Sequence, residues 1–171
     1  MSPPSPSIAP IRILVLHGPN LNLLGRREPH IYGSMTLADI NAQLAAVAGE
    51  LGIEIETFQS NHEGFLVDKL QENIDTVQGA LINPAGFTQF GVSLHDAIKA
   101  MPFPVIEVHI SNIASREPWR DHSIISSAAK ATVQGLGWRS YIAALRTLVD
   151  LVSEAQAGGA LATTAAPAGR G

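Results

Sequence analysis

The chain has 171 residues and a formal net charge of −4, so it is long enough for one domain with a sizeable core and is weakly acidic. The acidic balance argues against nucleic acid or an anionic membrane as the main partner, and the absence of cysteine excludes disulfides, thiolate metal ligands and cysteine nucleophiles. Charged residues make up only 15% of the chain, which indicates a homo-oligomer, because the centres of subunit interfaces are depleted in charge.

The two ends of the chain differ in composition from its middle. Residues 1–10 are rich in Pro and Ser and are predicted to form a disordered leader, and residues 154–171 are rich in Ala and Gly and are predicted to form a flexible tail. Residues 11–153 remain as a single domain. No apolar run reaches the roughly 20 residues that cross a bilayer. The start of the chain also lacks the basic and apolar parts of a signal peptide, so we expect a cytoplasmic protein.

Strand-like and helix-like segments alternate between these ends. Apolar runs predict strands over 11–16, 53–58, 80–83, 105–110 and 131–133. Helical spacing predicts helices over 36–51, 63–73 and 92–101, and a last one after Gly137. Thr36 is predicted to cap the first helix and Gly52 to end it. The outward-facing Glu54 and Glu56 indicate that the second strand lies near an edge of the sheet.

Five strands that alternate with helices predict a parallel sheet covered on both faces, which is a three-layer α/β sandwich. The chain is too short for a barrel, and its short crossovers favour the flavodoxin-like strand order 2-1-3-4-5. In the helix over 63–73, we expect Phe65, Leu66, Leu70 and Ile74 to face the core.

A long polar loop follows the first strand and carries Asn20, Arg27 and Tyr32. Sheets of this kind hold their ligands at the carboxyl ends of parallel strands, so the loop is predicted to lie at the site. A phenol near a guanidinium ionises more easily, because the positive charge favours the phenolate. Tyr32 is therefore a candidate general base, and Arg27 is its candidate activator.

Polar residues also end the third and fourth strands, namely Asn83, Glu107, His109 and Ser111. Glu107 and His109 are two apart on one strand and are predicted to point to the same side of the sheet. A buried carboxylate beside an imidazole fixes its tautomer and favours its protonated form, as a general acid requires. A core ion pair would show the same spacing. Ser111 and the backbone amides near it are candidates to bind a carboxylate.

Four arginines are candidates for a basic pocket that binds an anionic substrate: Arg26, Arg27, Arg116 and Arg120. Arg116 and Arg120 are spaced i, i+4 and are predicted to share one helix face, although such arginines usually face solvent. The chain contains no dinucleotide fingerprint, no Walker loop and no Gly-x-Ser-x-Gly elbow, and its six histidines show no metal-ligand spacing. We therefore expect acid–base chemistry on a small molecule, with no metal and no cofactor.

Several segments of the chain together resemble one known family. They are HGPNLNLLGRREP at 17–29, YG at 32–33, SNHEG at 60–64, NPAG at 83–86, IEVHISN at 106–112 and REPWRDHS at 116–123. In this combination the chain closely resembles the type II 3-dehydroquinate dehydratases, in one register over roughly residues 11–150. The resemblance implies an anti elimination of water from 3-dehydroquinate, through an enolate, to give 3-dehydroshikimate. That reaction belongs to the shikimate pathway of aromatic amino acid biosynthesis or to quinate catabolism.

The resemblance implies a catalytic role for each matching residue. Tyr32 would be the base, as a tyrosinate favoured by Arg27. Asn20 would help to hold the water that stabilises the enolate. His109, oriented by Glu107, would protonate the departing hydroxyl. These roles agree with those inferred from the residues, because a β-hydroxy ketone needs a base, an enolate stabiliser and an acid on the leaving group.

The resemblance also implies how the substrate is bound and how subunits assemble. Asn83 and Arg120 would bind ring hydroxyls, and Ser111 with the Ile110 amide would bind the substrate carboxylate. The loop over 24–34 would act as a lid. Subunits would gather as trimers into a dodecamer, in which Asp96 matches the acid that reaches a neighbouring subunit's site.

The chain departs from the family pattern after the NPAG turn. Gln89 stands where the family has a histidine that contacts a substrate hydroxyl, Phe90 replaces a smaller threonine, and His95 replaces an arginine. Glutamine still donates and accepts hydrogen bonds but carries no charge. A paralogue that runs the same elimination on another cyclic hydroxy ketone is therefore an alternative. A non-catalytic binding module of the same fold is a third possibility, which the joint presence of the base and acid residues disfavours.

Overall fold

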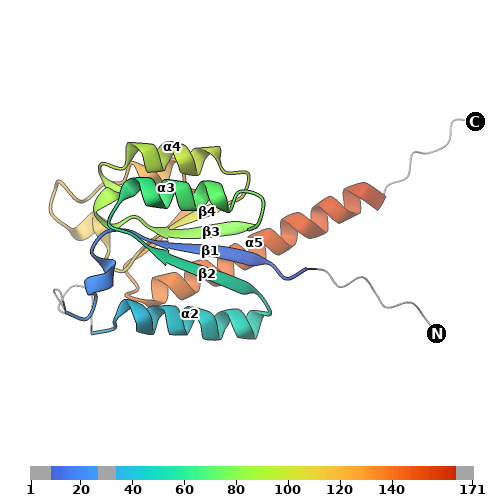
Figure 1. Cartoon of the computed structure of the whole chain (residues 1–171), viewed down its shortest axis with the longest axis horizontal. Helices are drawn as coiled ribbons and strands as arrows, with labels where there is room; N and C mark the ends of the chain where they lie inside the picture. Colours follow the sequence, from blue (N-terminus) through green and yellow to red (C-terminus); the bar gives the residue numbers. More distant parts are fainter. Residues whose placement is uncertain (1–8, 27–33, 165–171) are drawn as a thin grey trace, which may run out of the picture.

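Five strands form the centre of the molecule: β1 (Arg12–His17), β2 (Glu54–Gln59), β3 (Gly79–Asn83), β4 (Val105–His109) and β5 (Ala131–Gln134). The structure is a computed structural model that describes residues 9–26 and 34–164. All neighbouring strands are parallel, and their order is β2-β1-β3-β4-β5. Helices α2 (Leu37–Leu51) and α5 (Arg139–Thr164) cover one face, and α3 (Glu63–Glu72) and α4 (Val92–Ala100) cover the other (Figure 1). The predicted fold and strand order are confirmed.

Alternate residues of strand β1, which lies between β2 and β3, pack into two separate apolar cores. Ile13 and Val15 pack with α2 and α5, whereas Leu14 and Leu16 pack with α3 and α4. All four side chains are fully buried, because helices cover both faces of the sheet. Strand β2 lies at an edge and exposes Glu54, as its alternating pattern predicts.

Both ends of α2 follow the local sequence signals. The Thr36 hydroxyl accepts a hydrogen bond from the Asp39 amide at 3.1 Å, and the Asp39 carboxylate accepts one from the Thr36 amide at 2.9 Å. This reciprocal capping box satisfies two amides that the first helical turn leaves without partners. Gly52 ends the helix with a φ of 66°, a left-handed conformation that glycine adopts at little cost. The predicted cap and end of this helix are confirmed.

The predicted inner face of α3 is partly wrong. Leu66 and Leu70 are fully buried, but Phe65 is 56% exposed and Ile74 is 37% exposed. The Phe65 ring packs edge-on against His62 at the start of the helix, with 5.1 Å between ring centroids. Ile74 follows the last helical residue, Glu72, so helical spacing no longer turns it toward the sheet. A helix that packs on a sheet by one face buries a single stripe, which on α3 contains Leu66 and Leu70.

The chain's last helix is longer than its apolar pattern predicts. The sequence predicts a flexible tail from residue 154, whereas α5 continues to Thr164, so this prediction is wrong for residues 154–164. Residues 155–157 are Ala, Gln and Ala, which favour helix even without an apolar face to bury. The predicted leader over residues 1–8 and the tail over 165–171 lie outside the described residues.

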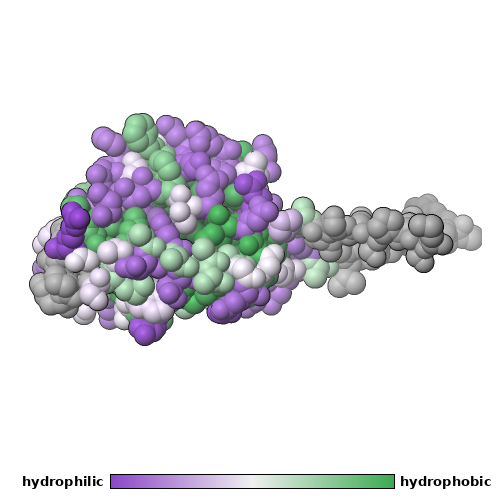
Figure 2. Space-filling view, turned by 60° about the horizontal axis from the view of Figure 1, so that its bottom comes forward, coloured by the Kyte–Doolittle hydropathy of each residue, from purple (hydrophilic) through white to green (hydrophobic). Residues whose placement is uncertain are grey.

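Hydrophilic and apolar side chains alternate over the surface shown in Figure 2. Among the described residues, Phe90, Val92 and Trp119 are large apolar side chains that are 70%, 62% and 53% exposed. Exposed apolar groups of this kind agree with the low proportion of charged residues. Within residues 9–26 and 34–164, no helix is long and apolar enough to cross a membrane.

Candidate active site

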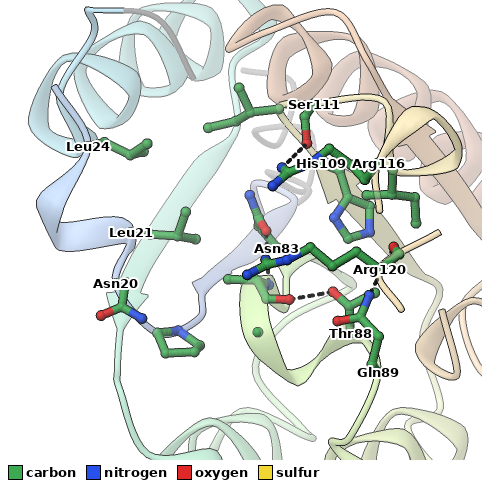
Figure 3. Close-up of a pocket in the computed structure, with 15 residues that line it drawn as sticks. Asn20, Leu21, Leu24, Asn83, Thr88, Gln89, His109, Ser111, Arg116 and Arg120 are labelled. Atoms are coloured by element: carbon green, nitrogen blue, oxygen red, sulfur yellow. Dashed lines mark hydrogen bonds between the residues drawn. The ribbon is translucent and has the colours of Figure 1, made fainter. Parts of the chain in front are cut away.

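The carboxyl ends of β1, β3 and β4 open into one pocket, as the parallel sheet predicts. Eight residues predicted for the site line it, and all of them except Ile110 are labelled in Figure 3: Asn20, Asn83, Gln89, His109, Ile110, Ser111, Arg116 and Arg120. Leu21 and Leu24, from the loop after β1, supply part of its apolar wall. Arg27 and Tyr32, predicted in the same loop, lie outside the described residues.

A close approach of two backbone segments places Gly18, two residues before Asn20, beside Asn83. The Gly18 amide donates to the Asn83 carbonyl at 2.8 Å. A Cβ atom at Gly18 would lie 2.5 Å from the Pro84 carbonyl oxygen, so only glycine permits this approach. The Asn20 backbone is left-handed, with a φ of 65°, and its amide donates to the Asn61 side-chain oxygen at 2.9 Å. These contacts hold the first turn of the long loop against the end of β3.

A buried polar network lies beneath Asn83. His17, its neighbour in the sheet register, has Nδ1 3.0 Å from the Tyr141 hydroxyl and Nε2 2.9 Å from the Asn41 side-chain oxygen. Burial lowers the pKa of His17 to about 4, although the hydrogen bond to Asn41 opposes that shift. Burial likewise raises the pKa of Tyr141, against a hydrogen bond from Asn83. His17 is therefore a neutral structural residue near pH 7.

The Glu107–His109 pair lies at the end of β4. His109 Nε2 is 2.7 Å from Glu107 Oε1, so the two side chains share one side of the sheet as predicted. Burial alone would raise the pKa of Glu107, but hydrogen bonds from His109, Ser123 and Ser126 outweigh it and hold the pKa below its ordinary value. Glu107 is therefore a charged carboxylate, and His109 lines the pocket above it. A pair that opens on a pocket in this way is available to a ligand, unlike a sealed core ion pair.

Three hydroxyl groups that the sequence reasoning missed hold the Glu107 carboxylate. Ser123 donates to Oε1 at 2.6 Å, and Ser126 donates to Oε2 at 2.5 Å. Thr132 on β5 lies 3.3 Å from Oε2. Thr132 is the register partner of Glu107 in the neighbouring strand, so pairing the predicted fourth and fifth strands would have found it. Ser123 ends the matching segment at 116–123, although no role was inferred for it, and nothing in the local pattern marks Ser126, which lies in the short helical turn Ile125–Ser127 before β5.

Two arginines supply positive charge at the pocket. Arg116 Nη1 donates to the Ser111 hydroxyl at 3.5 Å (Figure 3), and Arg120 stacks over the Trp119 ring at 4.1 Å. The predicted shared helix face is wrong, because the short helical turn Ile113–Ser115 ends before Arg116 and the chain continues as a turn. Pro118 disfavours helical geometry at the residue before it. Both arginines nevertheless line the pocket, whereas Arg26 does not.

Phe90 and Asp96, which the sequence analysis linked to substrate recognition and to a neighbouring subunit's site, lie outside this pocket. The Phe90 side chain is 70% exposed and is absent from the pocket lining, so it does not narrow the cavity. The Asp96 side chain on α4 is 74% exposed, with its carboxylate 2.9 Å from His95 Nδ1, and it does not line this pocket either. Gln89 does line the pocket, at the position the sequence predicts.

The arrangement suits proton transfer on a small polar anion. A charged carboxylate holds the imidazole of His109, and three amide side chains and two guanidinium groups line the same pocket. Within the described part of the chain, no three His, Asp or Glu side chains gather closely enough to hold a metal ion.

Comparison with known proteins identifies the family. Residues 11–149 match the family model described as "Dehydroquinase class II". The chain is 53% identical to a "3-dehydroquinate dehydratase 1" of Ralstonia nicotianae over 81% of this chain and 89% of that protein. It is 50% identical to a "3-dehydroquinate dehydratase" of Desulforudis audaxviator over 84% and 95% of the two chains.

Solved structures agree with these sequence matches. The crystal structure of a type II dehydroquinase from Butyrivibrio crossotus superposes with a TM-score of 0.80 and 37% identity, covering 81% of this chain and 97% of that one. A type II dehydroquinase from Propionibacterium acnes superposes with a TM-score of 0.77 and 41% identity, over 83% and 96% of the chains. The resemblance read from the motifs is therefore confirmed, and the chain belongs to the class II dehydroquinase family.

Proposed function

We propose that this chain is a 3-dehydroquinate dehydratase, a hydro-lyase that eliminates water from 3-dehydroquinate in anti geometry to give 3-dehydroshikimate. Family membership and the names of its relatives support this activity. One structural observation carries it: the Glu107–His109 pair opens on a pocket whose other polar groups are side-chain amides, hydroxyls and guanidinium groups. Such groups bind hydroxyls and carboxylates and leave the imidazole to transfer the proton.

The proposed reaction has two proton transfers. Tyr32, as a tyrosinate favoured by Arg27, takes a proton from the carbon beside the ketone, and the electron pair moves to form an enolate. Asn20 holds the water that donates a hydrogen bond to the enolate oxygen. When the enolate collapses to the conjugated double bond, the carbon–oxygen bond to the hydroxyl breaks. His109 gives its proton to that oxygen, which leaves as water, and the Glu107 carboxylate stabilises the imidazolium before transfer.

The remaining pocket residues bind the substrate. Asn83 and Arg120 bind ring hydroxyls, and Ser111 with the Ile110 amide binds the carboxylate. The position of Arg116, which donates to the Ser111 hydroxyl, supports this assignment because it brings positive charge to the same place.

We further propose a dodecamer built from trimers, located in the cytoplasm, in either the shikimate pathway or quinate catabolism. In that assembly Asp96 reaches the site of a neighbouring subunit. Two observations support this role: the Asp96 carboxylate is exposed, and Asp96 does not line the pocket of its own chain.

The function is tested by mixing purified protein with 3-dehydroquinate and following ultraviolet absorbance, because the product is a conjugated enone and the substrate is not. We expect absorbance to grow with wild-type protein and to stay flat with His109→Asn. The matched control is His62→Asn, since His62 lies outside the pocket and should retain the wild-type rate. A flat trace from folded wild-type protein would contradict the proposed activity.

A further inference from the structure

The side-chain amide of Gln89 donates its hydrogen bonds to the protein backbone. Its Nε2 donates to the Arg120 carbonyl at 3.2 Å and to the His122 carbonyl at 3.0 Å. An amide nitrogen carries two N–H groups, so these two bonds use both of them. Only the side-chain oxygen remains, and it accepts hydrogen bonds but donates none. Gln89 lines the pocket, but it therefore has no free N–H group to donate to a ligand and can only accept a hydrogen bond from one.

The segment that Gln89 holds is the one that carries Arg120. A third bond joins the same two stretches of chain, from the Ile124 amide to the Thr88 carbonyl at 3.0 Å. Figure 3 shows the Gln89–Arg120 hydrogen bond and the Arg120 side chain extending across the pocket. Since residues 116–124 contain no α-helix or strand, contacts of this kind decide where their side chains stand.

The Arg120 guanidinium itself has few anchors. It stacks over the Trp119 ring at 4.1 Å, and the Glu117 carboxylate lies 3.9 Å from Nε. Nε is buried and makes no hydrogen bond within the described part of the chain. Because few contacts hold the guanidinium, the position of the long Arg120 side chain depends on where its backbone lies.

We propose that Gln89 is a positioning residue that fixes the backbone at Arg120 and His122 and thereby sets where the Arg120 guanidinium stands over the pocket. This inference rests on the proposed function, because it concerns how the substrate hydroxyls meet Arg120. Ordering Arg120 before the substrate arrives removes part of the cost of binding. We expect the effect on substrate affinity and not on the rate of the chemical step, since the hydroxyls bound by Arg120 are not the hydroxyl that leaves as water.

The first test is Gln89→Met, which keeps the length of the side chain and removes both donors. We expect KM for 3-dehydroquinate to rise about tenfold while kcat stays within about twofold, the pattern for a contact equally strong in ground and transition states. Gln89→Glu should raise KM by a similar factor at neutral pH. Its KM should move back toward the wild-type value as the pH falls, because a protonated carboxyl regains one donor. The control is Gln78→Met, which loses the hydrogen bond that the Gln78 side-chain oxygen accepts from the Arg12 amide at the opposite end of the sheet, and it should leave KM unchanged.

A double-mutant cycle separates positioning from direct contact. If Gln89 acts through Arg120, adding Gln89→Met to an Arg120→Met variant changes KM by less than about twofold, because the group it positions is already gone. A further tenfold rise of KM in the double variant would mean that Gln89 binds the substrate itself, and would overturn the proposal. An unchanged KM in the single Gln89→Met variant would overturn it as well.

A measurement without substrate separates this inference from the proposed function. The chain has two tryptophans, Trp119 beneath Arg120 and Trp138 beneath Arg139. After incorporation of 5-fluorotryptophan, the fluorine resonance of Trp119 should shift or broaden in Gln89→Met, while that of Trp138 stays in place. A changed Trp119 resonance in a protein without turnover would overturn the proposed function and support the positioning role. Two unchanged resonances would overturn the positioning role whatever the activity.

Discussion

Replacing Glu107 by glutamine tests the charge beneath His109. The substitution keeps the shape of the side chain, and the hydroxyls of Ser123 and Ser126 can rotate to suit the new amide. What disappears is a full negative charge 2.7 Å from the imidazole. Two unit charges about 4 Å apart interact by about 4 kcal/mol at an effective dielectric constant of about 20, which sets an upper limit. A charged rather than neutral hydrogen bond accounts for about 2 kcal/mol, the lower end of the range.

Glu107→Gln should therefore lower kcat by about 30- to 1,000-fold, since each 1.36 kcal/mol is a factor of about ten in rate. KM should change little, because Glu107 does not line the pocket. Steady-state kinetics by ultraviolet absorbance measures both. The control is Glu63→Gln, which alters a carboxylate that accepts from the Leu94 amide outside the pocket and should cost stability without lowering kcat. A kcat within threefold of wild type, in a folded Glu107→Gln protein, would refute the role of the charge.

Two further predictions concern stability. The folded-state pKa of His17 is about 4, below its unfolded value of 6.5, so the unfolded chain binds the extra proton and stability falls as the pH drops through that window. Between pH 7.5 and 5, His17 should lower the free energy of unfolding by about 2 kcal/mol, as measured by urea titration. The loss should vanish in His17→Gln, and an equal loss in both proteins would contradict the prediction. Gly18→Ala should destabilise by about 1–3 kcal/mol and lower activity, because its Cβ would meet the Pro84 carbonyl. Gly49→Ala, with open space at its Cβ on α2, should instead stabilise by about 0.5–1 kcal/mol. Thermal melts measure both alanine variants, and a higher melting temperature for Gly18→Ala than for Gly49→Ala would rule out the argument.

The sequence by itself determined the features that depend on short-range periodicity. The two-residue spacing of Glu107 and His109 places them on one side of a strand, since side chains alternate across a sheet. The capping box at Thr36 and the left-handed end at Gly52 are likewise local. Alternation of strands and helices leads to a parallel sheet, and the polar ends of its strands then share one edge. The fold and the polar strand-end residues of the pocket, such as Asn83 and His109, follow from these rules.

Only the tertiary structure decided the contacts between segments distant in the chain. Which face of α3 is buried depends on how the helix docks, and Phe65 lies outside the stripe that Leu66 and Leu70 form. Ser123 and Ser126 reach Glu107 because a turn before β5 folds over the end of β4. Gln89 looks like a ligand contact in the sequence, whereas its amide binds the backbone of the Arg120 segment. A side chain's identity limits the bonds it can make, and the packing of its neighbours decides which of them form.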